Sequence, residues 1–305
     1  MSRVSGGSID LGLGPVNGIS TDSRLVESGD LFIACEGTRL DGASFIDEAI
    51  KRGATSFIAK KIVPGFPTLV DPNPRELVSN IGDKYFDSPT SQLLTIGVTG
   101  TNGKTTTSTL ISQLINLPHT LIGTLGTFLP DGSKEDIGLT TPDPLYIQKI
   151  ASETLKQGGK ALIMEVSSHA LHQGRVNGVM FDGAIFTNLT QDHLDYHGSM
   201  EEYFNSKSKL FSLLKENGKG VAFVEDHWGE KLLEKYPNLI EITADSYKIL
   251  SQDLRGSTFE YQEKPFFLPV VGEFNIRNAL LSLVLLDKLG IKVGSFEALN
   301  PVKGR

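Results

Sequence analysis

The sequence predicts an α/β fold with two domains: a small N-terminal α/β domain, and a larger domain in which helices cover a mostly parallel sheet. Short apolar runs rich in β-branched residues alternate with helical patterns, and this alternation is typical of parallel sheets. It is interrupted once, by the polar, Pro-containing stretch DSPTSQ (87–92). The 305 residues are 39% hydrophobic, which is enough apolar material for packed cores in both parts.

The first domain is expected to span residues 1–92. A helix at 44–53 is predicted to begin at Ser44 as its N-terminal cap and to end at Gly53. The final stretch, 87–92, is the expected linker to the second domain. The other elements predicted here are strands at 30–35 and 55–60 and a helix at 74–86.

The second domain is expected to span residues 93–305. Its first strand, 93–98, leads through a Gly-rich turn into a helix at 104–115, which is the pattern of a P-loop-type domain. The region 247–271 predicts short strands or hairpins. The remaining predicted elements are strands at 161–166, 183–188 and 220–224 and helices at 141–159, 199–214 and 274–290.

The composition excludes several classes of function. The net charge is −7, from 29 basic and 36 acidic residues, so we expect neither nucleic acid nor an anionic membrane as a partner. The single Cys35 excludes an internal disulfide and a Cys-based metal cluster, and it fits a reducing cytoplasm. No apolar stretch approaches the roughly 18 residues of a membrane span, and residues 1–13 lack the apolar region of a signal peptide.

The Gly-rich turn GVTGTNGKTTT (97–107) joins a predicted strand to a predicted helix, which is the context of a phosphate-binding loop. The common form of this loop has Gly where this chain has Val98. Lys104 can reach terminal phosphates, and the Thr105 hydroxyl can bind Mg²⁺. The alternative is a tight turn without a ligand. The candidate nucleotide contacts are Gly100, Thr101, Asn102, Gly103, Lys104, Thr105 and Thr106.

Several segments together resemble the Mur ligase family, the cytoplasmic amide-bond ligases of peptidoglycan precursor synthesis. Besides TGTNGKTTT, they are DSRLVESGDLFIACEG, MEVSSHAL, FTNLTQDHLDYHGSMEEYFNSKSKLF and GEFNIRNALL, in the family's order. The likeness spans essentially the whole chain and is greatest to the branch that adds the third stem-peptide residue. It implies that ATP activates a carboxylate of UDP-N-acetylmuramoyl-L-Ala-D-Glu as an acyl phosphate, which the amine of an amino acid then attacks.

The resemblance also implies two Mg²⁺ ions and a carbamylated lysine. The resemblance places the modification at Lys207, four residues after Tyr203 in the family's Y-x-x-x-K pattern, rather than at Lys209. Carbamylation by CO₂ replaces a positive charge with a negative one that can bind Mg²⁺. Glu165 ends a predicted buried strand, where ligands bind in open α/β sheets, and the alternative is a surface charge. Without the resemblance, His193 is interpreted as a loop histidine bonded to a carboxylate, and Lys207, like Lys209, as part of a solvated helix face. The implied metal ligands are Thr105, Glu165, His193 and carbamylated Lys207, and the implied catalytic residues are Lys104, His193 and Lys207.

Two groups of residues are expected, by the resemblance, to contact the UDP-muramoyl-dipeptide. Arg175 suits a carboxylate of D-glutamate, because a guanidinium forms two parallel hydrogen bonds with it. Three alternatives need no ligand: turns around Gly37 and Gly42, a helix cap at Thr141, and an ordinary ion pair at Arg175. The expected uridine-diphosphate contacts are Ser23, Thr38 and Arg39, and the other expected substrate contacts are Thr140, Thr141, Ser167, Gln173 and Arg175.

Asn275 and Asn278 lie three residues apart on one face of the last predicted helix, and the resemblance places them at adenine. The alternative is an N-terminal turn and cap. Arg305 is a further expected nucleotide contact. Family members have a third domain after this point, with the site for the incoming amino acid. The chain is therefore expected to be a truncated form that is not fully competent alone.

Three other interpretations stay open. The first is another member of the superfamily, such as folylpolyglutamate synthetase, which predicts folate binding instead of muramoyl-nucleotide binding. The second is a non-catalytic nucleotide-binding module or switch, which predicts ATP or GTP binding without an acyl phosphate. The third is an inactive fragment. The sequence determines neither the added amino acid, lysine or diaminopimelate among others, nor the oligomeric state.

Overall fold

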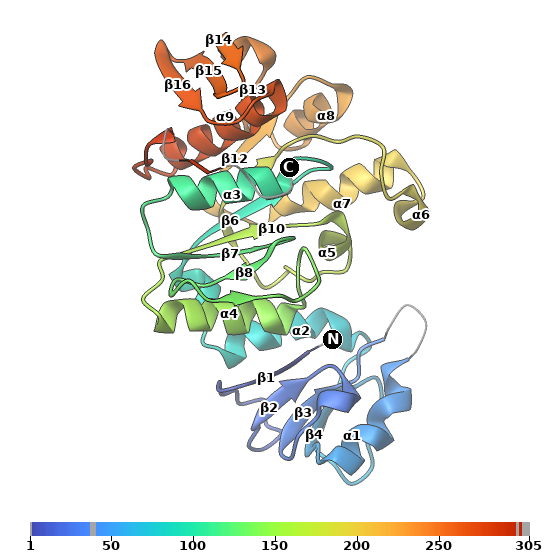
Figure 1. The fold of residues 1–305 in the computed structure, drawn as a ribbon. Helices are drawn as coiled ribbons and strands as arrows, with labels where there is room; N and C mark the ends of the chain where they lie inside the picture. The colour runs from blue at the N-terminus through green and yellow to red at the C-terminus, as the bar shows by residue number, and fades with distance from the viewer. Residues whose placement is uncertain (1, 37–40, 297–298, 301–305) are drawn as a thin grey trace. The chain divides into compact units, whose positions relative to one another are not determined.

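The computed structural model describes residues 2–36, 41–296 and 299–300. The chain forms two compact units, and Figure 1 labels most of their helices and strands. Among the described residues, no helix has the length and apolar character that crossing a membrane requires. The first unit contains residues 1–92, 142–155 and 174–179, and the second contains residues 93–141, 156–173 and 180–305.

The first unit is built on a five-stranded sheet in the order β1-β2-β3-β4-β5. Neighbouring strands are parallel except β1, which runs antiparallel to β2. Alternate residues of β3 point to opposite faces, so Leu31 packs with Val78 of α2 and Phe32 packs with Ala49 of α1. The elements are β1 (Arg3–Ser5), β2 (Gly18–Ser20), β3 (Asp30–Ile33), β4 (Ser56–Ala59), β5 (Thr68–Val70), α1 (Ile46–Arg52), α2 (Pro74–Tyr85) and α4 (Pro144–Lys156).

The predicted cap of the first helix is wrong. Asp41, not Ser44, provides the cap, because its carboxylate accepts a hydrogen bond from the Ala43 amide and starts a short 3₁₀ helix at Gly42–Phe45. The α-helix begins after this turn, at Ile46. Its predicted end is confirmed, since Gly53 adopts the left-handed conformation, with φ 103°, that glycine favours after a helix.

The second unit is built on an eight-stranded sheet in the order β13-β12-β11-β6-β10-β7-β8-β9. The six strands from β13 to β7 are parallel, and β8 and β9 add an antiparallel edge, so the predicted mostly parallel sheet is confirmed. The strands are β6 (Leu94–Thr99), β7 (His119–Gly123), β8 (Gly126–Phe128), β9 (Lys134–Glu135), β10 (Ala161–Glu165), β11 (Phe181–Phe186), β12 (Leu214–Phe223) and β13 (Ile240–Ile242).

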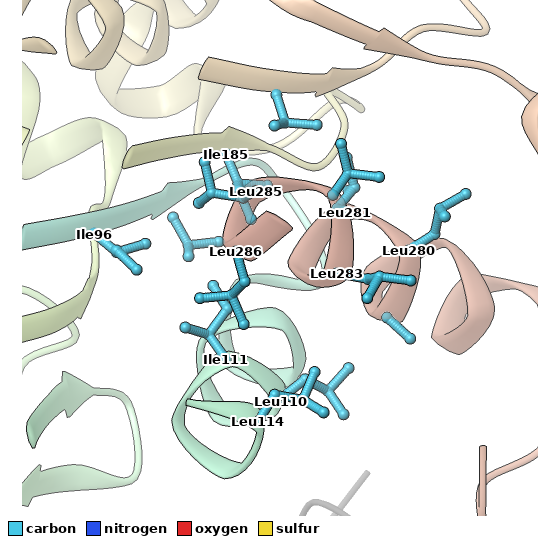
Figure 2. Close-up of a cluster of buried hydrophobic side chains, with 14 of the residues drawn as sticks. Ile96, Leu110, Ile111, Leu114, Ile185, Leu280, Leu281, Leu283, Leu285 and Leu286 are labelled. Carbon is cyan, nitrogen blue, oxygen red and sulfur yellow. The ribbon is translucent and has the colours of Figure 1, made fainter. Parts of the chain in front are cut away.

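Helices cover both faces of this sheet. On one face, α3 (Lys104–Leu114) packs against α9 (Glu273–Lys288), and Figure 2 shows Ile111 and Leu286 pointing toward one another between them. On the other face lies α7 (Met200–Ser212), whose Leu210 approaches Gly97 of β6. This unit therefore has three layers, with the sheet between two layers of helices. The packed helices hold the ends of the strands in fixed positions.

The remaining elements lie around this framework. The predicted hairpins in 247–271 are confirmed as a separate three-stranded antiparallel sheet. The predicted cap at Thr141 is wrong, because α4 begins at Pro144 and the Asp143 carboxylate accepts from the Leu145 amide. The elements are α5 (Ser168–His172), α6 (Leu194–His197), α8 (His227–Lys235), β14 (Lys248–Asp253), β15 (Gly256–Tyr261), β16 (Lys264–Leu268) and 3₁₀ helices at Ser23–Leu25, Pro89–Gln92 and Ala244–Ser246.

Candidate functional site

The candidate site lies in the second unit, where the carboxyl ends of four adjacent parallel strands meet. In sheet order these strands are β11, β6, β10 and β7. Ligands bind at this edge in open α/β sheets, because the loops after the strands converge there. The residues that follow β6, together with the end of β10, form the centre of the site.

The phosphate-loop geometry explains why Val98 stands in place of the usual glycine. Val98 is a fully buried residue inside β6, so the turn starts only after Thr99. Gly100 and Gly103 have φ values of 149° and 86°, which favour glycine. A Cβ atom on Gly100 would lie 1.9 Å from the Thr187 hydroxyl oxygen, so the neighbouring β11 end requires glycine at this position.

The loop is held from the end of β11 by two residues that the sequence analysis did not identify. The Thr187 hydroxyl donates to the Asn102 carbonyl. The Asn188 side chain accepts from the Asn102 amide at 2.9 Å and donates to the Asn102 carbonyl at 3.1 Å. Asn102 is therefore fixed at both of its backbone polar groups, which limits the conformations of the turn.

Two lysine side chains converge on one carbonyl oxygen of the loop. Lys104 Nζ lies 2.9 Å from the carbonyl oxygens of Gly100 and Thr101. Lys207 Nζ donates to the Gly100 carbonyl at 2.7 Å and lies 4.6 Å from the centre of the Tyr203 ring. Burial lowers the pKa of Lys207 well below its usual value, and the nearby charge of Lys104 lowers it further.

The position of Lys207 contradicts its interpretation as part of a solvated helix face. Its exposed fraction is 1%, whereas Lys209, on the same helix, is exposed. A lysine is almost never buried this deeply without a specific partner. The structure therefore distinguishes two lysines that the residue pattern, without the family resemblance, placed on the same solvated face.

Glu165 is also buried, with an exposed fraction of 1%, so the alternative of a surface charge is wrong. Its Oε2 atom accepts hydrogen bonds from the hydroxyls of Thr105 at 2.9 Å and Thr124 at 3.1 Å. Its Oε1 atom accepts from the Thr124 amide at 2.9 Å. A carboxylate can be buried when donors surround it in this way.

Segment 140–141 and Ser167 adjoin Glu165. The Thr141 hydroxyl donates to the Glu165 carbonyl at 2.9 Å and accepts from the Ser167 amide at 2.9 Å. Thr140 places its hydroxyl 3.1 Å from that of Thr124. The predicted contacts Thr140, Thr141 and Ser167 are thus brought together beside Glu165.

The other predicted substrate contacts belong to other segments of the chain. Gln173 follows α5, and its amide donates to the Tyr196 hydroxyl at 3.0 Å. Ser23 and Arg175 belong to the first unit, where the Ser23 hydroxyl donates to Glu48 at 2.7 Å. Thr38 and Arg39 lie outside the described residues, as does Arg305.

His193 precedes α6 in a left-handed conformation, with φ 50°. Its ring is about half exposed and lies 3.4 Å from the Asp192 carboxylate, as the interpretation without a metal expects. It also packs edge-on against His169, with 4.9 Å between ring centres. Within the described ranges, no group of three or more His, Cys, Asp or Glu side chains is arranged to hold a metal ion.

His197 lies beneath this surface, with an exposed fraction of 8%. Its ring nitrogens lie 3.0 Å from the Ser168 hydroxyl and 3.4 Å from the Ser206 hydroxyl. Burial, reinforced by the neighbouring His169, His172, Lys207 and His193, lowers its pKa to about 4. The folded protein thus holds this imidazole neutral where an unfolded chain begins to protonate it.

We expect this difference to reduce stability in mild acid. A lowered histidine pKa leaves stability intact above about pH 6.5 and removes it as the pH falls toward 4, because the unfolded state binds the proton first. The loss is at most about 3 kcal/mol. Urea unfolding from pH 7 to 4.5 should therefore show a flatter pH dependence for His197→Gln, whereas exposed His227→Gln should follow the wild type. Parallel curves for wild type and His197→Gln would contradict this assignment.

Near the loop, a cavity of about 300 Å³ opens beside α3 and α9. Asn275 lines it and donates to the Val271 carbonyl at 2.9 Å, and Asn278 is 8% exposed and adjoins Gly103. Gly272, not an asparagine, occupies the cap position of α9. The other lining residues are Thr106, Leu110, Leu254, Leu268, Pro269, Val270, Val271, Leu299 and Asn300.

The family model of the Mur ligase middle domain matches residues 98–286, which is more than half of the chain. The chain belongs to the Mur ligase family. A second model, the Mur ligase family catalytic domain, matches residues 15–65. The matched regions include the phosphate loop, Glu165, Lys207 and both asparagines of α9.

Among the curated Mur ligases, the UDP-N-acetylmuramoyl-L-alanyl-D-glutamate–2,6-diaminopimelate ligase of Gloeobacter violaceus is 39% identical over 298 residues. The match covers 93% of this chain and 61% of that protein, so the chain spans about three-fifths of its relative's length. A solved structure of a ligase with the same name matches with a TM-score of 0.74 and 30% identity, over 91% of this chain and 60% of that one.

Folylpolyglutamate synthase of Mycobacterium tuberculosis, solved in complex with ADP and AMPPCP, is a more distant match. It shares 14% identity with a TM-score of 0.57, covering 74% of this chain and 63% of that one. A likeness at this level shows a shared fold. The alternative of a folate enzyme thus has fold similarity but lacks the close sequence similarity of the muramoyl-peptide ligase.

Thr124, Thr187, Asn188 and Tyr203 contribute to the site, although the sequence analysis gave them no role. Thr187 and Asn188 could have been inferred, because they end a predicted strand at the same sheet edge as the loop. Thr124 follows β7, a strand that the sequence analysis did not predict. Tyr203 lies four residues before Lys207 on α7, and the Tyr203 hydroxyl lies 3.2 Å from that of Thr101.

Proposed function

We propose that this chain contains the nucleotide-binding and UDP-muramoyl-peptide-binding parts of an ATP-dependent amide-bond ligase. The ligase would add an amino acid to UDP-N-acetylmuramoyl-L-Ala-D-Glu through an acyl phosphate, in cytoplasmic peptidoglycan precursor synthesis. One observation carries the proposal: a buried lysine and a buried carboxylate both adjoin a phosphate-type loop. A plain strand-to-helix turn needs neither group. The name of the Gloeobacter relative supports the same substrate.

The loop and the nearby cavity suit ATP. The first backbone amides of α3 and the positive end of this helix suit phosphate oxygens. Lys104 can exchange its bonds with the loop carbonyls for bonds with phosphates, which are stronger because both partners are charged. The cavity of about 300 Å³ offers apolar walls and Asn275 for a base.

The residues present also fit Mg²⁺, with two ions expected. Thr105 and Glu165 place oxygen atoms beside the loop, and a carbamate on Lys207 would add two more. His193 is the remaining candidate ligand. Because no group of three or more carboxylates and imidazoles meets among the residues that the structure describes, phosphate oxygens would complete the coordination of an ion. Bound Mg²⁺ would neutralise charge on the reacting phosphates.

The protein's own groups would orient the acceptor substrate. Thr140, Thr141 and Ser167 adjoin Glu165, and Gln173 lies at the end of α5. Arg175, Ser23, Thr38 and Arg39 are the other proposed contacts. Their role would be to hold the acceptor carboxylate for attack on the terminal phosphate, because positioning is the main contribution of a protein to phosphoryl transfer.

Calorimetry with three ligands tests this function. We expect the chain to bind Mg·ATP and UDP-N-acetylmuramoyl-L-Ala-D-Glu and not to bind folate. The Lys104→Met variant should lose affinity for Mg·ATP by at least about tenfold, because a charge-assisted bond is worth about 1.5–3 kcal/mol. Tight folate binding would favour the folate enzyme, and ATP binding without any muramoyl-nucleotide binding would favour a nucleotide-binding module.

A further inference from the structure

Thr124 occupies the point where two parts of the site meet. Thr124 directly follows β7 and is exposed. Its hydroxyl donates to Glu165 Oε2 at 3.1 Å, and its amide donates to Oε1 at 2.9 Å. The same hydroxyl oxygen lies 3.1 Å from the Thr140 hydroxyl. Because a hydroxyl has one proton and Thr124 gives it to the carboxylate, Thr140 is the donor in the second bond.

The carboxylate of Glu165 is therefore held from three directions. The Thr124 amide fixes one oxygen, and the hydroxyls of Thr124 and Thr105 share the other. The backbone of Gly123 lies directly against the carboxylate, since a Cβ atom there would be 2.3 Å from Oε1. Without the Thr124 hydroxyl, Oε2 would keep only its hydrogen bond from Thr105, and Oε1 would keep its hydrogen bond from the Thr124 amide.

Segment 140–141 contacts Glu165 by two routes. Thr140 contacts the Glu165 side chain indirectly, through Thr124. The Thr141 hydroxyl donates directly to the main-chain carbonyl of Glu165 at 2.9 Å. Glu165 in turn bonds to Thr105 in the first turn of α3. A continuous series of hydrogen bonds thus joins segment 140–141 to the phosphate loop, and each member responds to the orientation of the next.

We propose that Thr124 is a positioning residue that couples segment 140–141 to Glu165 and, through Glu165, to the phosphate loop. A ligand that takes up the Thr140 hydroxyl would change the hydrogen bonding of Thr124 and so the orientation of Glu165 Oε2. Thermodynamic coupling is reciprocal, so occupation of the loop would also affect segment 140–141. The identity of the ligands, Mg·ATP and the muramoyl dipeptide, rests on the proposed function.

The test measures the dissociation constant of Mg·ATP by calorimetry over a range of free Mg²⁺. Thr124→Val keeps the shape and the amide but removes the hydroxyl, and we expect affinity to fall by about three- to tenfold. Thr124→Ser should restore it. Thr127→Val is the matched control in the same hairpin, because the buried Thr127 hydroxyl finds no hydrogen-bond partner among the described residues. It should leave the dissociation constant unchanged.

A double variant tests the coupling itself. Thr140→Val should weaken Mg·ATP binding in the wild-type background and have no further effect in Thr124→Val, because Thr140 acts through Thr124. Wild-type affinity in Thr124→Val would overturn the coupling and leave the proposed function standing. Equal losses in the Val and Ser variants, or a lowered unfolding temperature, would indicate a structural role and overturn it too. A folded wild type that binds no Mg·ATP would refute the proposed function, and this inference with it.

Discussion

Lys207→Ala is expected to abolish carbamate formation and to weaken Mg·ATP binding by at least about tenfold, which is about 1.4 kcal/mol. Carbamate forms when a neutral amine attacks CO₂, the nitrogen then giving its proton to water. Burial supplies that neutral amine, because it lowers the pKa of Lys207 well below the usual 10.5. Incubation with ¹³C-bicarbonate should therefore give a carbamate resonance in the wild type that Lys207→Ala lacks.

The same helix provides the control. Lys209 is exposed, so Lys209→Ala should keep the carbamate resonance and the affinity for Mg·ATP. Since Ala leaves a cavity in place of a buried side chain, Lys207→Met serves as a second variant that fills the space. Depletion of bicarbonate should weaken binding in the wild type and leave both Lys207 variants unchanged. A carbamate signal that survives in Lys207→Ala would refute the assignment.

Gly100→Ala is expected to damage both stability and nucleotide binding. The added Cβ would lie 1.9 Å from the Thr187 hydroxyl oxygen, and the φ of 149° is unfavourable for any other residue. The combined strain and clash should cost about 2–4 kcal/mol of unfolding free energy. Urea denaturation gives this difference directly, and calorimetry with Mg·ATP should show no measurable binding, because the loop amides are displaced.

Gly132→Ala separates strain from the clash. Gly132 has a φ of 84° and nothing within 4 Å of an added Cβ, so this variant should cost only about 1 kcal/mol and should keep nucleotide affinity. Gly100→Ala combined with Thr187→Ala should recover part of the lost stability by removing the contacted hydroxyl. Equal losses in Gly100→Ala and Gly132→Ala would mean that the contact with Thr187 has little effect.

The central sheet could be predicted from the sequence because its strands are apolar runs separated by helical patterns. Strand 93–98 and helix 104–115 differ from β6 and α3 by a single residue at the ends. The short strands β1, β2 and β8 escaped prediction, since three residues are too few to show periodicity. Helix starts at Asp41 and Asp143 were misplaced, because two candidate capping residues stood near each other.

Site residues that form a contiguous sequence motif could be predicted from the sequence, whereas those whose role depends on burial could not without the family resemblance. The loop residues 100–105 form a contiguous pattern with a known mechanism. In the sequence, only the family resemblance distinguishes Lys207 from Lys209, and it is the packing of α7 against the sheet that makes Lys207 a buried amine. The contact roles of the substrate and nucleotide residues, and the domain boundary at 92–93, stay predictions.

The pairing of α3 with α9 affects when the proposed nucleotide site can form during synthesis. Ser282 of α9 bonds to the Thr107 carbonyl of α3, 175 residues earlier in the chain. Such a distant contact forms late, because a long intervening chain must first be ordered. During synthesis the phosphate loop will thus be made long before the helix that supports it. A ribosome-bound chain that ends before residue 273 should fail to bind nucleotide, even though it already carries every residue of the loop.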